Sequence, residues 1–118
     1  MQGRKITSGK YHQLRKKRAF ERQKQEREVV LGETKIKSIR VRGNNQKTFL
    51  LKSNVANVLV ESKAQKTQIT NVIETPQNKF WARQNRIVKG AIIETPLGKA
   101  RITNRPTQEG NINAVLIK

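Results

Sequence analysis

Residues 35–61 read KIKSIRVRGNNQKTFLLKSNVANVLVE, and they decide the fold class because they contain three β-type runs separated by turn residues. In the first run, basic side chains alternate with apolar ones, as in a strand with one exposed face. Gly43, Asn44 and Asn45 tolerate positive φ and predict a turn after that run. We therefore expect strands near 35–42, 47–52 and 55–61.

The β-type pattern continues to the end of the chain. Of the 34 apolar residues after position 28, 19 are Val or Ile, which favour strands over helices. Further strands are expected near 67–74, 87–95, 99–104 and 112–117, with a helical turn over 77–86 anchored by Phe80 and Trp81. Pro76, Pro96 and Pro106 mark strand exits. The pattern predicts an all-β domain, a small closed or partly open β-barrel of about six to seven short strands.

Residues 1–28 differ in composition from residues 29–118. They carry ten Lys or Arg, three Glu and only six apolar side chains, which are too few to offset the entropy of ordering the segment. We predict an extended basic arm over 1–28, disordered or partly helical when free, with a helix over 13–28 that forms on binding. The β-barrel domain is expected to span 29–118.

The overall charge points to a polyanionic partner. The chain has 26 Lys and Arg against eight acidic residues, a formal charge of +18, and such self-repulsion destabilises a compact monomer. With no Cys and one His, we expect no disulfide framework and no multi-Cys/His zinc site, and we predict no metal site. No apolar run reaches the ~18–20 residues of a membrane span, and no apolar stretch follows the basic N-terminus as in a secretory signal.

The candidate nucleic-acid-binding residues are the cations of the arm and those of the domain that lack an acidic partner. The run Arg15–Arg18 is the densest, and cations that neutralise phosphates release counterions and so bind strongly. A solvated charged face or a nuclear-import signal would contain the same residues. Arg40 and Arg42 share one strand face, and Lys47 is expected to extend their patch. The full set is Arg4, Lys5, Lys10, Tyr11, Arg15, Lys16, Lys17, Arg18, Arg22, Arg40, Arg42, Asn44, Lys47, Arg83, Arg86, Lys89, Arg101 and Arg105.

Catalytic groups are scarce in this sequence. It has no Asp, its only His is His12 in the arm, and no phosphate-loop spacing occurs. A short repeat, VIETP at 72–76 and IIETP at 92–96, places Glu74 and Glu94 at equivalent positions, but no other carboxylate pair is evident. We predict no enzymatic activity and no small-molecule substrate.

Residues 89–117, KGAIIETPLGKARITNRPTQEGNINAVLI, closely resemble the C-terminal signature of one family. It is the archaeal and eukaryotic small-subunit ribosomal protein numbered eight in the e-type nomenclature. Residues 42–47 with 54–58 resemble its middle block, residues 2–18 resemble its basic leader, and the short length resembles the archaeal form. The chain departs from the family at Asn44 and Ser8, where the family commonly has Gly. Asn tolerates left-handed angles, so we expect the turn at Asn44 to survive.

The resemblance implies a β-barrel on the body of the small ribosomal subunit, with a basic extension threading into rRNA, no catalysis and no required cofactor. The implied partners are small-subunit rRNA and neighbouring small-subunit ribosomal proteins, with no membrane. The free protein is expected to be a monomer, and its location cytoplasmic and ribosome-associated. The charge alone leaves two alternatives open: a general nucleic-acid-binding protein of chromatin or RNA processing, and a small enzyme acting on RNA.

Overall fold

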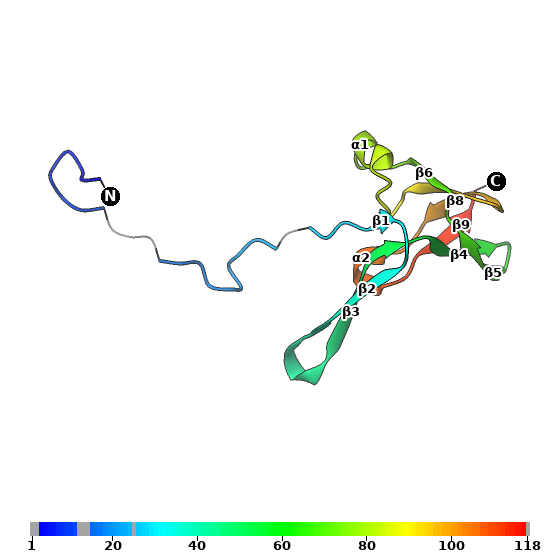
Figure 1. Cartoon of the computed structure of the whole chain (residues 1–118), viewed down its shortest axis with the longest axis horizontal. Helices are drawn as coiled ribbons and strands as arrows, with labels where there is room; N and C mark the ends of the chain where they lie inside the picture. Colours follow the sequence, from blue (N-terminus) through cyan, green and yellow to red (C-terminus); the bar gives the residue numbers. More distant parts are fainter. Residues whose placement is uncertain (1–2, 12–14, 25, 118) are drawn as a thin grey trace.

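Short strands dominate the structure, as the sequence predicts. The computed structural model describes residues 3–11, 15–24 and 26–117, and within them nine strands form two sheets (Figure 1). The smaller sheet has the order β1-β3-β2, with β1 (Val30–Leu31), β2 (Lys35–Arg40) and β3 (Gln46–Ser53). The larger has the order β5-β4-β9-β8-β7-β6, with β4 (Val55–Val60), β5 (Lys63–Gln68), β6 (Asn71–Glu74), β7 (Ile92–Thr95), β8 (Gly98–Ile102) and β9 (Asn113–Leu116). The helices α1 (Lys79–Arg83) and α2 (Pro106–Glu109) and the 3-10 turn η1 (Arg42–Asn44) are short connections.

The larger sheet buries one face of its strands. Val58 pairs with Ala114, which in turn pairs with Ile102, and none of these three side chains is more than 2% exposed. The next residues along β4 and β9, Leu59 and Val115, pair on the other face and are 38% and 40% exposed. The period of two in the sequence thus separates core from surface. Residues outside the larger sheet that complete the core are Val29, Leu50, Ile69, Ile87, Ala91 and Ile112.

The predicted closure into a barrel is wrong for the part of the chain that the structure describes. β5 and β6 form the two edges of the larger sheet, yet only Ile69 and Thr70 separate them in the chain. The Ile69 N–H bonds the Asn54 carbonyl next to β4, whereas the Thr70 N–H bonds the Glu94 carbonyl of β7. The predicted single strand 67–74 is therefore divided between two edges, and the strands continue end to end instead of pairing.

The other predicted elements agree with the structure to different degrees. The predictions 35–42, 47–52, 55–61, 99–104 and 112–117 match β2, β3, β4, β8 and β9 within a few residues. The predicted strand 87–95 pairs only over Ile92–Thr95, and β1 and the first part of β5 were not predicted. The helical turn over 77–86 contains α1, whose start is capped by Asn78 Oδ1, which accepts from the Phe80 N–H at 2.9 Å.

The short repeat is two copies of one local structure. The buried Thr75 hydroxyl donates to the Asn78 carbonyl after β6, and the buried Thr95 hydroxyl donates to the Gly98 carbonyl at 2.7 Å after β7. Each Thr thereby closes the turn that leaves its strand. The register pairs Glu74 with Ile92 and Glu94 with Asn71, so the two carboxylates do not pair with each other across the strands.

The arm extends away from the two sheets (Figure 1). All of its described residues up to position 28 are exposed, and they contain no helix. The helix predicted over 13–28 is thus not formed in 15–24 or 26–28, and its formation on binding stays a prediction. Residues 13 and 14, with His12 before them, and residue 25 lie outside the described residues.

Candidate nucleic-acid interface

The β2–β3 hairpin projects from the sheets and carries the first group of candidate residues (Figure 1). Its tip turns through Gly43 at φ 74° and Asn44 at φ 58°, and the Val41 N–H bonds the Asn45 carbonyl at 2.7 Å. Asn44 therefore occupies the left-handed region, and the turn forms with this side chain in place of the family's Gly. Arg40, Arg42 and Lys47 are all exposed.

The register divides the expected patch between the two faces of the hairpin. Lys47 lies directly opposite Ile39, whereas Arg40 lies opposite Gln46. Because directly paired residues share a face, Lys47 points to the same side as Ile39 and away from Arg40. Sequence reasoning placed all three cations on one face, but it had no information on the pairing across the turn.

The first arm cations lie in a small loop. Arg4 and Lys10 form an isolated antiparallel bridge, and the Lys5 N–H bonds the Gly9 carbonyl at 3.0 Å. The Lys5 ammonium lies 5.7 Å from the centre of the Tyr11 ring. Ser8, the second departure from the family, has φ 61°. Both departures thus fall where the backbone is left-handed and where Gly has no steric cost.

A second turn in the arm is organised by an acidic residue. The Glu21 carboxylate accepts two hydrogen bonds from the Arg15 guanidinium, at 2.9 and 3.1 Å, and one from the Arg18 N–H at 2.9 Å. Arg15 is therefore partly neutralised inside the arm. Lys16, Lys17 and Arg18 are exposed, and Arg22 donates to the Lys17 carbonyl at 3.3 Å.

Acidification is expected to open this turn. The Arg15 guanidinium, and next the Arg18 N–H, lower the pKa of the Glu21 carboxyl below its ordinary value of 4.5. A lowered pKa means that ionised Glu21 stabilises the turn, and this contribution is lost as the pH falls through the lowered value. The Arg18 amide resonance should then move to its unstructured position. A Glu21→Gln chain should show that position already at neutral pH, and identical titrations of the two chains would contradict the assignment.

The base of the arm is fixed to the domain by two cations. The Arg27 guanidinium stacks 3.7 Å above the centre of the Phe49 ring of β3. Arg86 forms an ion pair with Glu28, lies 5.2 Å from the Trp81 ring, and its side chain is only 17% exposed. Arg86, a candidate for binding, therefore already has contacts inside the protein. Trp81 packs against this cation at the arm base.

The remaining candidates are exposed and lie on separate elements. Arg83 is on α1, where it lies 5.9 Å from the Phe80 ring, and Lys89 is in the loop before β7. Arg101 is on the outer face of β8, opposite Val115 of β9, and Arg105 precedes α2. The structure thus groups candidates in the arm and on the hairpin, and leaves these four dispersed.

Sequence reasoning missed Lys24 and Arg27, which lie beside the hairpin at the arm base.

Sequence reasoning also missed α2, whose position is set by Asn104. The Asn104 amide donates to Glu109 Oε2 at 2.9 Å and to the Asn111 carbonyl at 2.9 Å, while its oxygen accepts from the Asn113 N–H. Pro106 at the first position of α2 and Gly110 at φ 79° after its end are signals that could have revealed it.

Neither a metal site nor a membrane-spanning helix has candidates among the described residues. No group of three or more His, Cys, Asp or Glu side chains in ranges 3–11, 15–24 and 26–117 could hold a metal ion. In the same ranges, no helix has the length and apolar character needed to cross a membrane.

Comparison with known proteins gives consistent matches along the chain. The family model described as ribosomal protein S8e matches residues 1–117. A protein of Methanocella arvoryzae named small ribosomal subunit protein eS8 is 47% identical, over 97% of this chain and 93% of its own length. Proteins of the same name from Methanocorpusculum labreanum and Haloarcula marismortui are 45% and 42% identical, each over 98% of this chain and 94% of their own lengths.

Proposed function

The chain belongs to the ribosomal protein S8e family, and from this premise we propose that it is a structural constituent of the small ribosomal subunit. Its arm and its β2–β3 hairpin are the surfaces that bind small-subunit rRNA. The candidate residues of these two surfaces are those from Arg4 to Arg22 and from Arg40 to Lys47.

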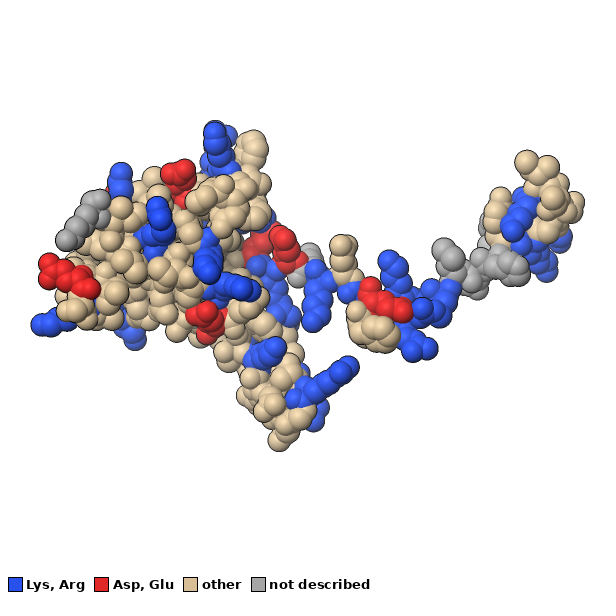
Figure 2. Space-filling model, turned by 180° about the vertical axis from the view of Figure 1, so that it is seen from behind, with Lys and Arg blue, Asp and Glu red and all other residues tan. Residues whose placement is uncertain are grey.

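The observation that carries this proposal is the distribution of cations without acidic partners. In the described part of the chain, the ion pairs are Arg15–Glu21 and Arg86–Glu28, against 26 Lys and Arg in the sequence. Residues 34–60, which include the hairpin, contain no acidic residue. Figure 2 shows Lys and Arg side chains along the arm and on the projecting hairpin. The hairpin can therefore approach phosphates without repulsion from carboxylates of its own, and in the arm Glu21 is paired with Arg15.

The shapes of the two surfaces suit the shape of folded RNA. An exposed arm can follow the narrow space between packed RNA helices, where phosphates are close together, and each neutralised phosphate releases counterions. A two-stranded hairpin can contact the backbone across a shallow groove. Both modes recognise backbone and shape more than base sequence. The arm orders when it binds, and the domain over 29–118 docks on the subunit surface.

A structural role explains why the sequence contains few catalytic groups. The protein needs no cofactor and acts on no small-molecule substrate. It is a monomer when free, and its partners on the subunit are rRNA and neighbouring small-subunit ribosomal proteins. Its location is the ribosome in the cytoplasm.

Sedimentation with ribosomal subunits separates this proposal from general nucleic-acid binding in chromatin or RNA processing. We expect the protein to sediment with small subunits and to stay bound when excess duplex DNA is added. A general binder would move to the DNA in proportion to its phosphate concentration, since both polymers offer similar charge. Release of the protein by duplex DNA at equal phosphate would contradict the proposal.

A further inference from the structure

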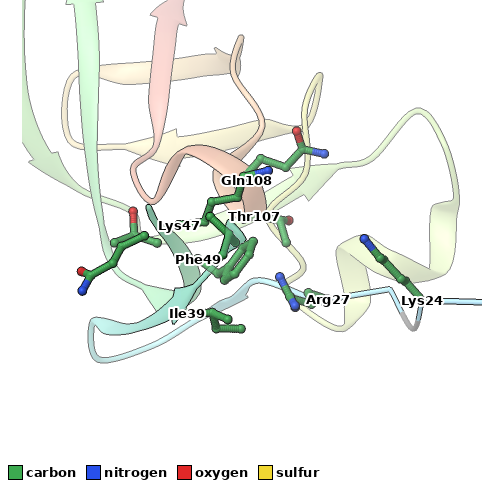
Figure 3. A pocket seen from close by; sticks show the side chains of 10 residues that line it. Lys24, Arg27, Ile39, Lys47, Phe49, Thr107 and Gln108 are labelled. Carbon is green, nitrogen blue, oxygen red and sulfur yellow. The ribbon is translucent and has the colours of Figure 1, made fainter. Parts of the chain in front are cut away.

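A groove separates the arm base from the hairpin and has a volume of about 750 Å³. Three elements form it: the arm supplies Lys24 and Arg27, the hairpin supplies Lys47 and Phe49, and α2 supplies Thr107 and Gln108 (Figure 3). This volume is within the range of roughly 300–1,000 Å³ that small-molecule sites occupy. The groove is thus large enough for a single nucleotide.

The groove lining combines positive charge with an apolar wall. Lys24, Arg27 and Lys47 provide three cations, and no acidic side chain of the described residues lines the groove. Ile39 and Phe49, which share a face of the hairpin, provide apolar surface. A nucleotide offers the complementary combination, an anionic phosphate and a flat base. A base within an A-form helix is stacked and paired, so only an unpaired nucleotide could present its base here.

A stacking surface for that base is already in place. The Arg27 guanidinium covers one face of the Phe49 ring at 3.7 Å, while Arg27 itself is exposed. Unpaired bases stack on guanidinium planes as well as on aromatic rings. The position of Arg27 is fixed by its neighbours, because Glu28 pairs with Arg86 and Val29 is 1% exposed in the core.

We propose that this groove holds one unpaired nucleotide of the small-subunit rRNA. Its base stacks on the Arg27–Phe49 pair, and its phosphate lies between the ammonium groups of Lys24 and Lys47. The inference rests on the proposed function and adds to it a site for a single extruded base. The competing occupant, an extended peptide of a neighbouring protein, is one outcome of the test below.

The test uses the full chain and three RNA probes: a four-nucleotide single strand, the same sequence in a duplex, and a single strand with abasic positions. Binding is followed by titration and by the NMR signals of the Phe49 ring. Arg27→Lys keeps the charge but removes the planar stacking surface, and Phe49→Leu keeps the apolar bulk. Phe80→Leu is the matched control, because the exposed Phe80 ring of α1 also lies beside an arginine, Arg83, but does not line the groove. Amide spectra confirm that each variant is folded.

We expect Arg27→Lys and Phe49→Leu to weaken binding of the single strand about tenfold, in line with the cost of losing one base stack. Phe80→Leu should change it less than about twofold, and the abasic strand should leave the Phe49 signals unmoved. Equal effects of Phe49→Leu and Phe80→Leu, or a preference for the duplex at the Phe49 ring, would overturn the inference. So would a Phe49 ring that responds only to a peptide from a neighbouring ribosomal protein. In each of these cases salt-dependent binding of rRNA would persist, whereas loss of all rRNA binding by the wild-type chain would refute the proposed function itself.

Discussion

A chain that lacks residues 1–23 is expected to bind small-subunit rRNA fragments at least about 100-fold more weakly than the full chain at moderate salt. This segment contains eight Lys and Arg and one Glu, so the deletion removes a net charge of +7. All of its described side chains are exposed, and the arm extends away from the two sheets (Figure 1). The loss of affinity should therefore come from lost phosphate contacts and not from unfolding.

The position of the cut decides whether the deletion tests binding alone. Arg27 stacks on Phe49, Glu28 pairs with Arg86, and Val29 belongs to the core. Removal of residues 1–28, the arm as the sequence defines it, would break the first two of these contacts. A cut after residue 23 spares them, and cooperative thermal unfolding should then match that of the full chain. A shortened chain that unfolds without cooperativity would show that the arm supports the fold.

A pair of charge-matched variants separates the arm from general electrostatic attraction. One variant replaces Lys16, Lys17 and Arg18 by Gln, and the other replaces Lys63, Lys66 and Lys99, which are exposed on β5 and β8. Both lose three positive charges. The arm variant should lose far more affinity for rRNA than the β5–β8 variant, and equal losses would mean that position does not matter.

The second large effect is expected from Ile93→Ala, which should destabilise the domain by about 2–5 kcal/mol. Ile93 is completely buried at the centre of β7, between Val72 of β6 and Ala100 of β8. Its truncation leaves a cavity in a core made largely of Ala, Val and Ile. A loss of this size is a large fraction of the stability of a small domain, about 5–15 kcal/mol. Chemical denaturation followed by circular dichroism measures it.

The matched control is Ile73→Ala on the neighbouring strand. Ile73 is 40% exposed, so the same substitution there should cost less than about 1 kcal/mol. If the two substitutions destabilised the protein equally, the assignment of the inner and outer faces of the larger sheet would be wrong.

Much of the fold could be predicted because local patterns encode it. The alternation in residues 35–61 and the Gly43–Asn45 turn led to β2, β3 and β4 within a few residues. Local patterns could not decide whether the sheet closes into a barrel, because this depends on which carbonyls accept from the N–H groups of Ile69 and Thr70. Both residues lie in a run whose pattern predicts one continuous strand. The accepting carbonyls belong to Asn54 and Glu94, which lie far from these two residues in the chain.

The candidate interface was predictable in composition but not in arrangement. The density of cations identified the arm, and the structure gives Arg15 and Arg86 partners that the sequence could not show. The register across the turn was unknown from the sequence, so the sequence could not show that Lys47 lies on a different face from Arg40. Arg27 was missed because its significance depends on Phe49, 22 positions later in the chain, and on the groove that the two residues share with α2.

The central claim is that the arm and the hairpin hold rRNA by contacts with its phosphates, and the salt dependence of binding tests it most directly. The logarithm of the affinity of the full chain for a small-subunit rRNA fragment should fall steeply and linearly with the logarithm of the salt concentration. Without residues 1–23 the slope should be shallower by up to about six, since each lost phosphate contact removes roughly 0.7–0.9 from it. A slope near zero for the full chain, or the same slope for both chains, would contradict the account.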